Sequence, residues 1–400
     1  GPALDDACVV VAGGNIDYAG PRDRAPIPDQ ARIVDIAGKT ILPGLIDAHV
    51  HAGNIALQME DTARLSPAVY VHRVTHNLET AVDLGFTTLR DAAGLDWSFV
   101  DAVDQELING PRLLLSVSPL TATGGHFDMR GIYDKTVVAR NRLGICPEIC
   151  DGPDAVRRAA RDVLRRGAAQ IKVAADGGVD SPSDQPGHWQ FSVTELAAAV
   201  EVAEAAGTYV MAHAYTPRAI ENCLQAGVRS IEHGNLLDAS TARKMAAAGA
   251  FFVPTLTVYD VLANEGRGGL APYAAKKLDG VAQSGREAVR IAREAGVAIA
   301  SGSDIIGPYQ ELKGRELRIK SELLSPMEAI VSATRTNARL LNMDDRIGTL
   351  AAGKEADLII MDGDPLADPT LFERGRETVL MVVKAGRVMK DRLPRLAREG

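Results

Sequence analysis

The alternation of short apolar runs with longer amphipathic segments constrains the fold of this chain more than any other feature. Eight apolar runs are expected as strands, at residues 41–46, 87–90, 112–117, 170–173, 209–212, 230–232, 251–255 and 298–300. Alanine-rich segments with helical spacing lie between and after them, at residues 69–84, 154–167, 194–207, 217–227, 240–249, 274–296 and 325–341. Parallel strands need such crossover segments, and eight of these units make a (β/α)8 TIM barrel. A doubly wound open sheet is the alternative.

The two ends of the chain have a different character. Residues 7–38 and 353–388 contain short β-rich runs separated by turn-forming residues, a pattern typical of antiparallel hairpins. Because the two ends match, we predict one small β domain built from residues 1–40 and 345–400, with the α/β barrel formed by residues 41–344.

Polar residues gather where the predicted strands end. In a (β/α)8 barrel the chemistry lies at the carboxyl ends of the strands. These positions hold His49, His51, Asp91, His126, Lys172, His213, His233 and Asp304, which include five of the eight histidines. His49 and His51 are two residues apart, so in a strand their imidazoles point the same way, as two ligands of one metal ion would. The pattern predicts a metal site, in which Asp304 could be both a ligand and a proton acceptor.

Lys172 is unusual because it lies inside an apolar strand. A charged amine is costly to bury unless it is paired or neutralised. One interpretation is an ion pair with a nearby acid such as Asp176. The other, which the surrounding histidines favour, is that carbon dioxide has converted the amine to a carbamate whose two oxygens bridge two metal ions.

The run from Pro43 to His51, together with Lys172, His213, His233 and Asp304, resembles the amidohydrolase superfamily in residue type and order. The resemblance extends over essentially the whole chain. It implies a distorted (β/α)8 TIM barrel with a small β-sandwich domain formed from both termini.

The resemblance also implies a binuclear metal centre. One divalent ion would be held by His49, His51 and Asp304, the other by His213 and His233, with carboxylated Lys172 as the bridge. Zinc is the first expectation, and manganese, cobalt or iron are alternatives. The related single-metal deaminases usually carry a His-x-x-Glu element, whereas His213 is followed by Ala-Tyr-Thr.

Two further elements are similar to the Xaa-Pro/Xaa-Arg dipeptidase (prolidase-like) branch and to its relatives that hydrolyse ochratoxin and phenylureas. They are the loop that ends in Thr-Gly-Gly-His126 and the His213-Ala-Tyr215 element. The resemblance implies that His126 polarises the scissile carbonyl and that Tyr215 meets the substrate carboxylate. Arg130 is a further candidate for substrate binding. Asp304 and His126 are thus the expected catalytic residues.

The expected function is hydrolysis of an amide bond in a dipeptide or an N-acyl amino acid. The first alternative is hydrolysis of a xenobiotic amide, carbamate or urea at the same binuclear site, because the loops that decide this are hard to interpret from sequence. A remote alternative is a non-catalytic scaffold protein, which would typically have lost metal ligands that this chain retains.

Composition limits the possible partners. The net charge of −8 argues against nucleic acid and anionic membranes as partners. The resemblance implies a small-molecule substrate. The sequence contains no run of about 18 apolar residues, so no membrane span is expected. The four cysteines indicate reduced thiols and a cytoplasmic protein, with a Cys146–Cys150 disulfide as the alternative. The resemblance implies a homo-oligomer.

Overall fold

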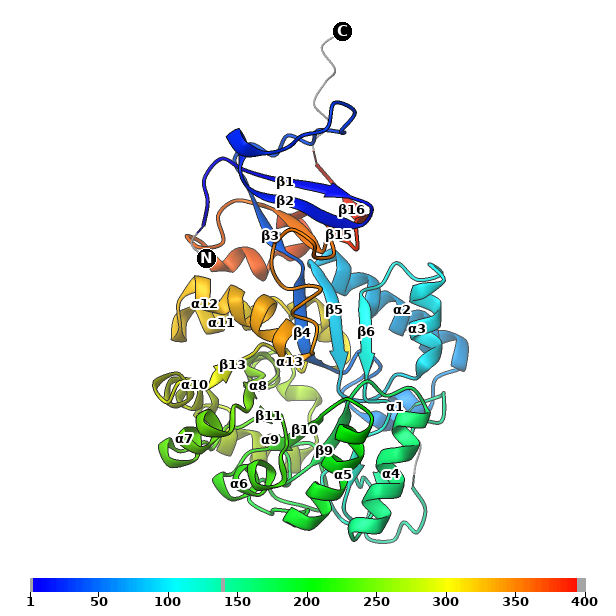
Figure 1. Ribbon diagram of the computed structural model, residues 1–400. Helices are drawn as coiled ribbons and strands as arrows, with labels where there is room; N and C mark the ends of the chain where they lie inside the picture. Colours follow the sequence, from blue (N-terminus) through cyan, green and yellow to red (C-terminus); the bar gives the residue numbers. More distant parts are fainter. Residues whose placement is uncertain (1–2, 138–140, 394–400) are drawn as a thin grey trace.

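The computed structural model describes residues 3–137 and 141–393, and its centre is a set of parallel strands (Figure 1). One parallel sheet has the order β4-β5-β6, and the other has the order β13-β12-β11-β10-β9-β7-β8. The strands are β4 (Leu45–Val50), β5 (Phe86–Asp91), β6 (Arg112–Leu115), β7 (Leu120–Thr121), β8 (Glu148–Ile149), β9 (Ile171–Ala174), β10 (Val210–Ala214), β11 (Ser230–His233), β12 (Phe251–Val253) and β13 (Ala298–Ile299). The expected α/β class is confirmed.

Backbone hydrogen bonds join the two parallel sheets on both sides. Ala48 N on β4 donates to Ser301 O, just after β13, at 2.9 Å. On the other side, Ala169 N, just before β9, donates to Leu115 O on β6 at 2.7 Å. The strands therefore form a closed core consistent with a TIM-like barrel, and its carboxyl end collects the loops after β4, β9, β10, β11 and β13.

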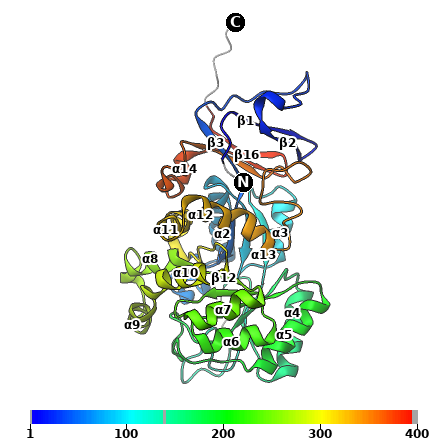
Figure 2. The same ribbon diagram turned by 60° about the vertical axis from the view of Figure 1, so that its left-hand side comes forward.

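Helices form the outer layer, as Figures 1 and 2 show. The α-helices are α1 (Met59–Ala63), α2 (Pro67–Asp83), α3 (Trp97–Asp104), α4 (Pro153–Arg165), α5 (Val193–Ala205), α6 (Pro217–Ala226), α7 (Ala239–Ala248), α8 (Leu256–Ala263), α9 (Pro272–Val281), α10 (Ser284–Glu294), α11 (Arg315–Leu323), α12 (Pro326–Val331), α13 (Asn337–Leu340) and α14 (Gly375–Thr378). Short turns of other helix types are η1 (Arg22–Arg24), η2 (Arg267–Gly269), η3 (Gly307–Leu312), η4 (Ser332–Thr336) and η5 (Pro369–Phe372). Local sequence explains several ends: Ser192 and Glu195 form a capping box at the start of α5, and Gly227 ends α6 in a left-handed conformation.

Antiparallel strands from both chain ends lie at one end of the molecule (Figure 1). One sheet is the hairpin of β1 (Ala7–Ala12) and β2 (Asn15–Pro21), and the other has the order β16-β15-β14-β3. The strands of the second sheet are β3 (Lys39–Pro43), β14 (Leu358–Asp362), β15 (Val379–Lys384) and β16 (Arg387–Asp391). The β-sandwich arrangement and the domain boundaries stay predictions, and β3 spans the expected boundary at residues 40–41.

Two predicted elements are each divided in the structure. The single strand expected at residues 41–46 is β3 followed by β4, because the backbone changes partner at Gly44. Gly44 N donates to Asp357 O beside β14, whereas Leu45 N donates to Gly85 O beside β5. The single helix expected at residues 274–296 is α9 followed by α10. Asn235 Nδ2 donates to the carbonyl oxygen of Val281, the last residue of α9, at 2.9 Å.

Among the residues that the structure describes, no helix is both long enough and apolar enough to cross a bilayer. Cys146 and Cys150 are not joined to each other: Cys146 Sγ lies 3.5 Å from Gly144 O, and Cys150 is buried.

Candidate metal centre and active site

The predicted ligands converge at the carboxyl end of the barrel. His49 lies on β4 with His51 just beyond it, Lys172 lies on β9, His213 on β10, His233 on β11, and Asp304 in the loop after β13. All six line one cavity of about 100 Å³, and His126 and Tyr215 line it as well. The structure thus brings together residues that are up to 255 positions apart in the sequence.

Asp304 lies between the histidines. Its Oδ1 atom is 3.5 Å from His49 Nε2 and 3.4 Å from His51 Nε2, and its Oδ2 atom is 3.7 Å from His233 Nδ1. Possible ligand atoms of His49, His233 and Asp304 all lie within 4.8 Å of one another. On the other side of His233, the ring centroid of His213 is 4.6 Å away. The described side chains therefore form one continuous cluster of nitrogen and oxygen donors.

One atom of this cluster tests whether a metal ion fits. His49 Nε2 is fully buried and has no hydrogen-bond partner among the described residues. Buried polar atoms in proteins are nearly always satisfied, so an atom left over in this way requires an explanation. A lone pair directed at a carboxylate and at further imidazoles is the donor arrangement that zinc-like ions bind. The residues present therefore fit a divalent metal.

Electrostatics keep the imidazoles in the form that binds metal. Burial lowers the pKa of His49, His213 and His233 well below 6.5, and the positive charge of Lys172 lowers it further. Burial raises the pKa of Asp304 to about 8, against the opposing effect of Lys172. Neutral imidazoles beside a buried carboxyl favour a cation in this cavity.

The acid considered as a partner of Lys172 is already engaged elsewhere. Both carboxylate oxygens of Asp176 accept hydrogen bonds from Tyr215 N, at 2.9 and 3.0 Å, and Oδ2 also accepts from Thr216 N and Thr216 Oγ1, at 2.9 Å each. Asp176 thus fixes the start of the loop after β10. The carbamate on Lys172 stays a prediction.

His126 lies beside the metal cluster on a loop after β7. Its ring stacks on His213 with centroids 4.2 Å apart, and its Nδ1 atom is 3.2 Å from Ser181 Oγ. Ser181 Oγ donates to Asp184 Oδ1, and Lys277 Nζ lies 3.3 Å from that oxygen. Sequence reasoning missed Ser181 and Asp184 because nothing in a Gly- and Ser-rich loop shows which hydroxyl will face the histidine.

Tyr215 lies on the opposite side of His213, with ring centroids 4.7 Å apart. Its hydroxyl accepts a hydrogen bond from Tyr259 Oη at 2.9 Å, a partner that the sequence did not reveal. Arg130 is placed differently: it pairs with Asp128 at 2.6 and 2.7 Å and is not among the cavity-lining residues. The rest of the wall is mainly apolar and includes Phe127, Val179, Val258, Leu262 and Ile306.

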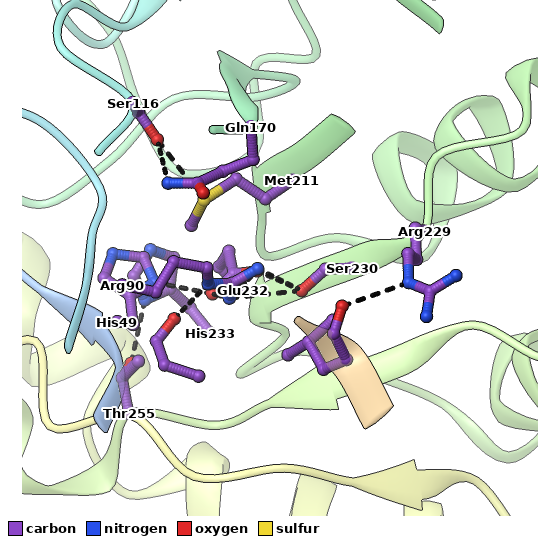
Figure 3. Close-up of polar contacts among 12 residues, drawn as sticks. His49, Arg90, Ser116, Gln170, Met211, Arg229, Ser230, Glu232, His233 and Thr255 are labelled. Atoms are coloured by element: carbon purple, nitrogen blue, oxygen red, sulfur yellow. Dashed lines mark hydrogen bonds and ion pairs between the residues drawn. The ribbon is translucent and has the colours of Figure 1, made fainter. Parts of the chain in front are cut away.

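The ligand histidines on β4 and β11, His49 and His233, each contact a second side chain through Nδ1 (Figure 3). His49 Nδ1 lies 2.6 Å from Glu232 Oε2, and His233 Nδ1 lies 2.8 Å from Thr255 Oγ1. Glu232 is paired with Arg90. The sequence gives little hint of this pair, because β5 (Phe-Thr-Thr-Leu-Arg-Asp) and β11 (Ser-Ile-Glu-His) each mix polar and apolar residues.

A larger cavity of about 440 Å³ opens at the other end of the barrel. Its lining includes Ala168 and Ala169, just before β9, and Thr208 and Tyr209, just before β10. Among the described residues that line it, there is no histidine, lysine or acid. The smaller cavity is therefore the candidate active site, despite its size.

Comparison with known proteins agrees with this geometry. Residues 40–389 match the amidohydrolase family. Ochratoxinase from Aspergillus niger is 31% identical over 408 residues, which cover 98% of this chain and 84% of that protein. A crystal structure of a prolidase complexed with N-methylphosphonate-L-proline is 40% identical, with a TM-score of 0.93 and coverage of 97% of this chain and 95% of that chain. A crystal structure of a Xaa-Pro dipeptidase with bound methionine is 29% identical, with a TM-score of 0.84 and coverage of 95% and 94%. The chain therefore belongs to the amidohydrolase family, in its prolidase-like branch.

Proposed function

We propose that this protein is a metal-dependent hydrolase that cleaves the amide bond of a dipeptide or an N-acyl amino acid. The observation that carries the proposal is one cavity lined by six candidate metal ligands together with His126 and Tyr215. The similarity to a prolidase in complex with a phosphonate derivative of proline supports this substrate class.

The family resemblance assigns this donor set to two divalent ions. His49, His51 and Asp304 would hold one, His213 and His233 the other, and a carbamate on Lys172 would bridge them. Such ions, when bound, polarise a carbonyl and make water a nucleophile near neutral pH. Zinc fits this donor set first, with manganese, cobalt and iron as alternatives.

The protein residues then handle the protons. Asp304 takes the proton of the attacking water and returns it to the leaving nitrogen. The Ser181 hydroxyl donates its single proton to Asp184, so it accepts a hydrogen bond from His126 Nδ1. The other ring nitrogen of His126, Nε2, then faces the substrate. In its protonated form, His126 donates from Nε2 to the carbonyl oxygen on which charge develops.

Tyr215 is arranged to bind a carboxylate. Its oxygen accepts from Tyr259, so its own proton remains to be donated to the substrate. The apolar wall formed by Phe127, Val258 and Leu262 would receive an apolar side chain.

The alternative substrate class is a xenobiotic amide, carbamate or urea. Two observations favour it: the wall of the cavity is mainly apolar, and no arginine is among its lining residues in the described chain. Ochratoxinase, at 31% identity, is a relative of this kind.

Both substrate classes are tested by measuring which members of a substrate panel the metal-loaded protein hydrolyses. The panel contains Xaa-Pro and Xaa-Arg dipeptides, N-acyl amino acids, an ochratoxin-type amide and phenylureas, and metal content is counted on the same sample. Two metals with dipeptide turnover support the proposal, and two metals with turnover of only aryl amides or ureas support the alternative. A protein that binds no metal under any loading contradicts both. The homo-oligomeric state and the cytoplasmic location stay predictions.

A further inference from the structure

A fully buried ion pair lies directly behind His49 (Figure 3). Arg90 on β5 and Glu232 on β11 have side chains that are 0% exposed. Arg90 Nη2 donates to both oxygens of Glu232, at 2.9 and 3.0 Å, and Arg90 Nε donates to Ala48 O on β4. The arginine thus connects the strand that carries His49 to the strand that carries His233.

Apart from its contact with His49, the Glu232 carboxylate accepts hydrogen bonds from donors alone. Oε1 accepts from Arg90 and from Ser230 Oγ, and Oε2 accepts from Arg90. His49 Nδ1 lies 2.6 Å from Oε2, so this nitrogen must carry the imidazole proton. The other nitrogen, Nε2, then presents a lone pair to the cavity, and it is the atom that has no hydrogen-bond partner within the described residues.

We propose that Glu232, held by Arg90, is a positioning residue that fixes His49 in the Nδ1-protonated tautomer and thereby prepares Nε2 for metal before any metal arrives. The inference rests on the proposed metal-dependent function. Outer hydrogen bonds of this kind orient a ligand histidine and strengthen its binding.

Arg90 explains why a carboxylate can be used here without competing for the metal. Three hydrogen bonds from Arg90 Nη2 and Ser230 Oγ hold the two oxygens of Glu232 away from the cavity, and the opposite charges of Arg90 and Glu232 balance. Without the arginine, a buried carboxylate would be left uncompensated.

The first experiment records the tautomer in the full-length, metal-free protein. Two-bond proton–nitrogen NMR spectra of protein labelled with ¹⁵N-histidine distinguish the two neutral tautomers, and the missing signals of His49→Asn assign the residue. We expect the Nδ1-protonated form at His49. The Nε2-protonated form would overturn the inference, whether or not the protein is an enzyme.

The second experiment measures zinc affinity by competition with a chelator. Glu232→Gln replaces one acceptor oxygen with a donor, and we expect affinity to fall about 10- to 100-fold. The matched control is Asp357→Asn, which removes another buried carboxylate that is paired with an arginine, Arg112, and bonds no ligand histidine. Its affinity should stay within about twofold, the scatter expected of a residue that shares no hydrogen-bond partner with the ligands. An equal loss in both variants, or no loss in Glu232→Gln, would overturn the inference.

Should Glu232→Gln not fold, the double variant Arg90→Met/Glu232→Leu takes its place, because apolar replacement of a whole buried ion pair often preserves stability. It should lose zinc affinity by the same factor, and unchanged affinity would overturn the inference. If the wild-type protein binds none of zinc, manganese, cobalt and iron, the proposed function fails, while the tautomer measurement still decides the role of Glu232.

Discussion

The two sides of the candidate active site are built differently. The metal side stands on barrel strands: His49 and Glu232 have fully buried side chains, and each is fixed by partners on strands across the barrel. The substrate side stands on loops, where His126 is oriented by Ser181 and Asp184. Exposed apolar side chains occur on these loops, including Trp189 at 51% and Ile132 at 97% exposure. Strands therefore define the metal chemistry, and loops define what is cleaved.

If this division is correct, variants of the metal side and of the substrate side should fail in different ways. Loss of a proton carrier at the metals should stop the chemistry whatever the substrate. Changes on the loops should alter turnover and leave metal content and unfolding temperature as they are.

The largest effect is expected from Asp304→Asn. The amide cannot take the proton of the attacking water, so kcat should fall about 1,000-fold, within the range known for general bases. Metal should stay bound, since the histidine ligands remain. Steady-state kinetics and metal analysis on one sample check this. A variant with full activity would remove Asp304 from its catalytic role.

His126→Asn should lower kcat about 100-fold, because a neutral amide cannot replace the charged donor that a protonated imidazole directs at the carbonyl oxygen. Metal content and melting temperature should match the wild type, since His126 holds no metal in this proposal. Loss of metal in this variant would mean that the two sides of the site are not independent.

Ser181→Ala should have a smaller effect, about tenfold on kcat, because one hydrogen bond that orients His126 is lost. Combined with His126→Asn, it should add nothing further, as expected of residues that act through one another. Ser183→Ala is the matched control, because Ser183 lies in the same loop as Ser181. Its hydroxyl donates to Gly124 O at 3.4 Å, and the variant should leave kcat unchanged. Equal losses in the two serine variants would show a general disturbance of the loop.

The smallest effect is expected from mild acid. Burial disfavours the charged imidazolium and so lowers the pKa of His49, His213 and His233 well below 6.5. At pH 6.5, where an ordinary histidine is about half protonated, these three stay neutral and keep their lone pairs for metal. Metal content after equilibration at pH 6.5 should therefore equal that at pH 7.5. Release of half the metal at pH 6.5 would contradict the pKa shifts.

The sequence was informative where periodicity and strand ends are decisive. The spacing of His49 and His51 and the strand-end positions of His213 and His233 predicted a cluster, because parallel strands bring such ends together. The support behind them was hidden, since no local pattern says that Arg90 will meet Glu232 across the barrel. The partner of Arg130 was hidden for a similar reason: only the folded loop shows that it pairs with Asp128.

Some boundaries were missed for a related reason. The apolar run at residues 41–46 gives no indication that its backbone leaves one sheet for another at Gly44, since both strands are apolar. The break between α9 and α10 coincides with a bond from Asn235 to Val281 O, which joins segments 46 residues apart. Contacts between distant segments, which propensity does not encode, decide such details.

The hydrogen bonds that close the barrel also determine when the metal centre can be completed during synthesis of the chain. Asp304 N donates to His49 O at 2.7 Å, so the last ligand reaches the first only after more than 250 residues of intervening chain have been made. At about 5–20 residues per second, the ribosome needs roughly 10–50 seconds for that stretch. Throughout this time the nascent chain carries histidines without their carboxylate partner. The complete centre is therefore acquired only after residue 304 has been made, long after the first two ligands.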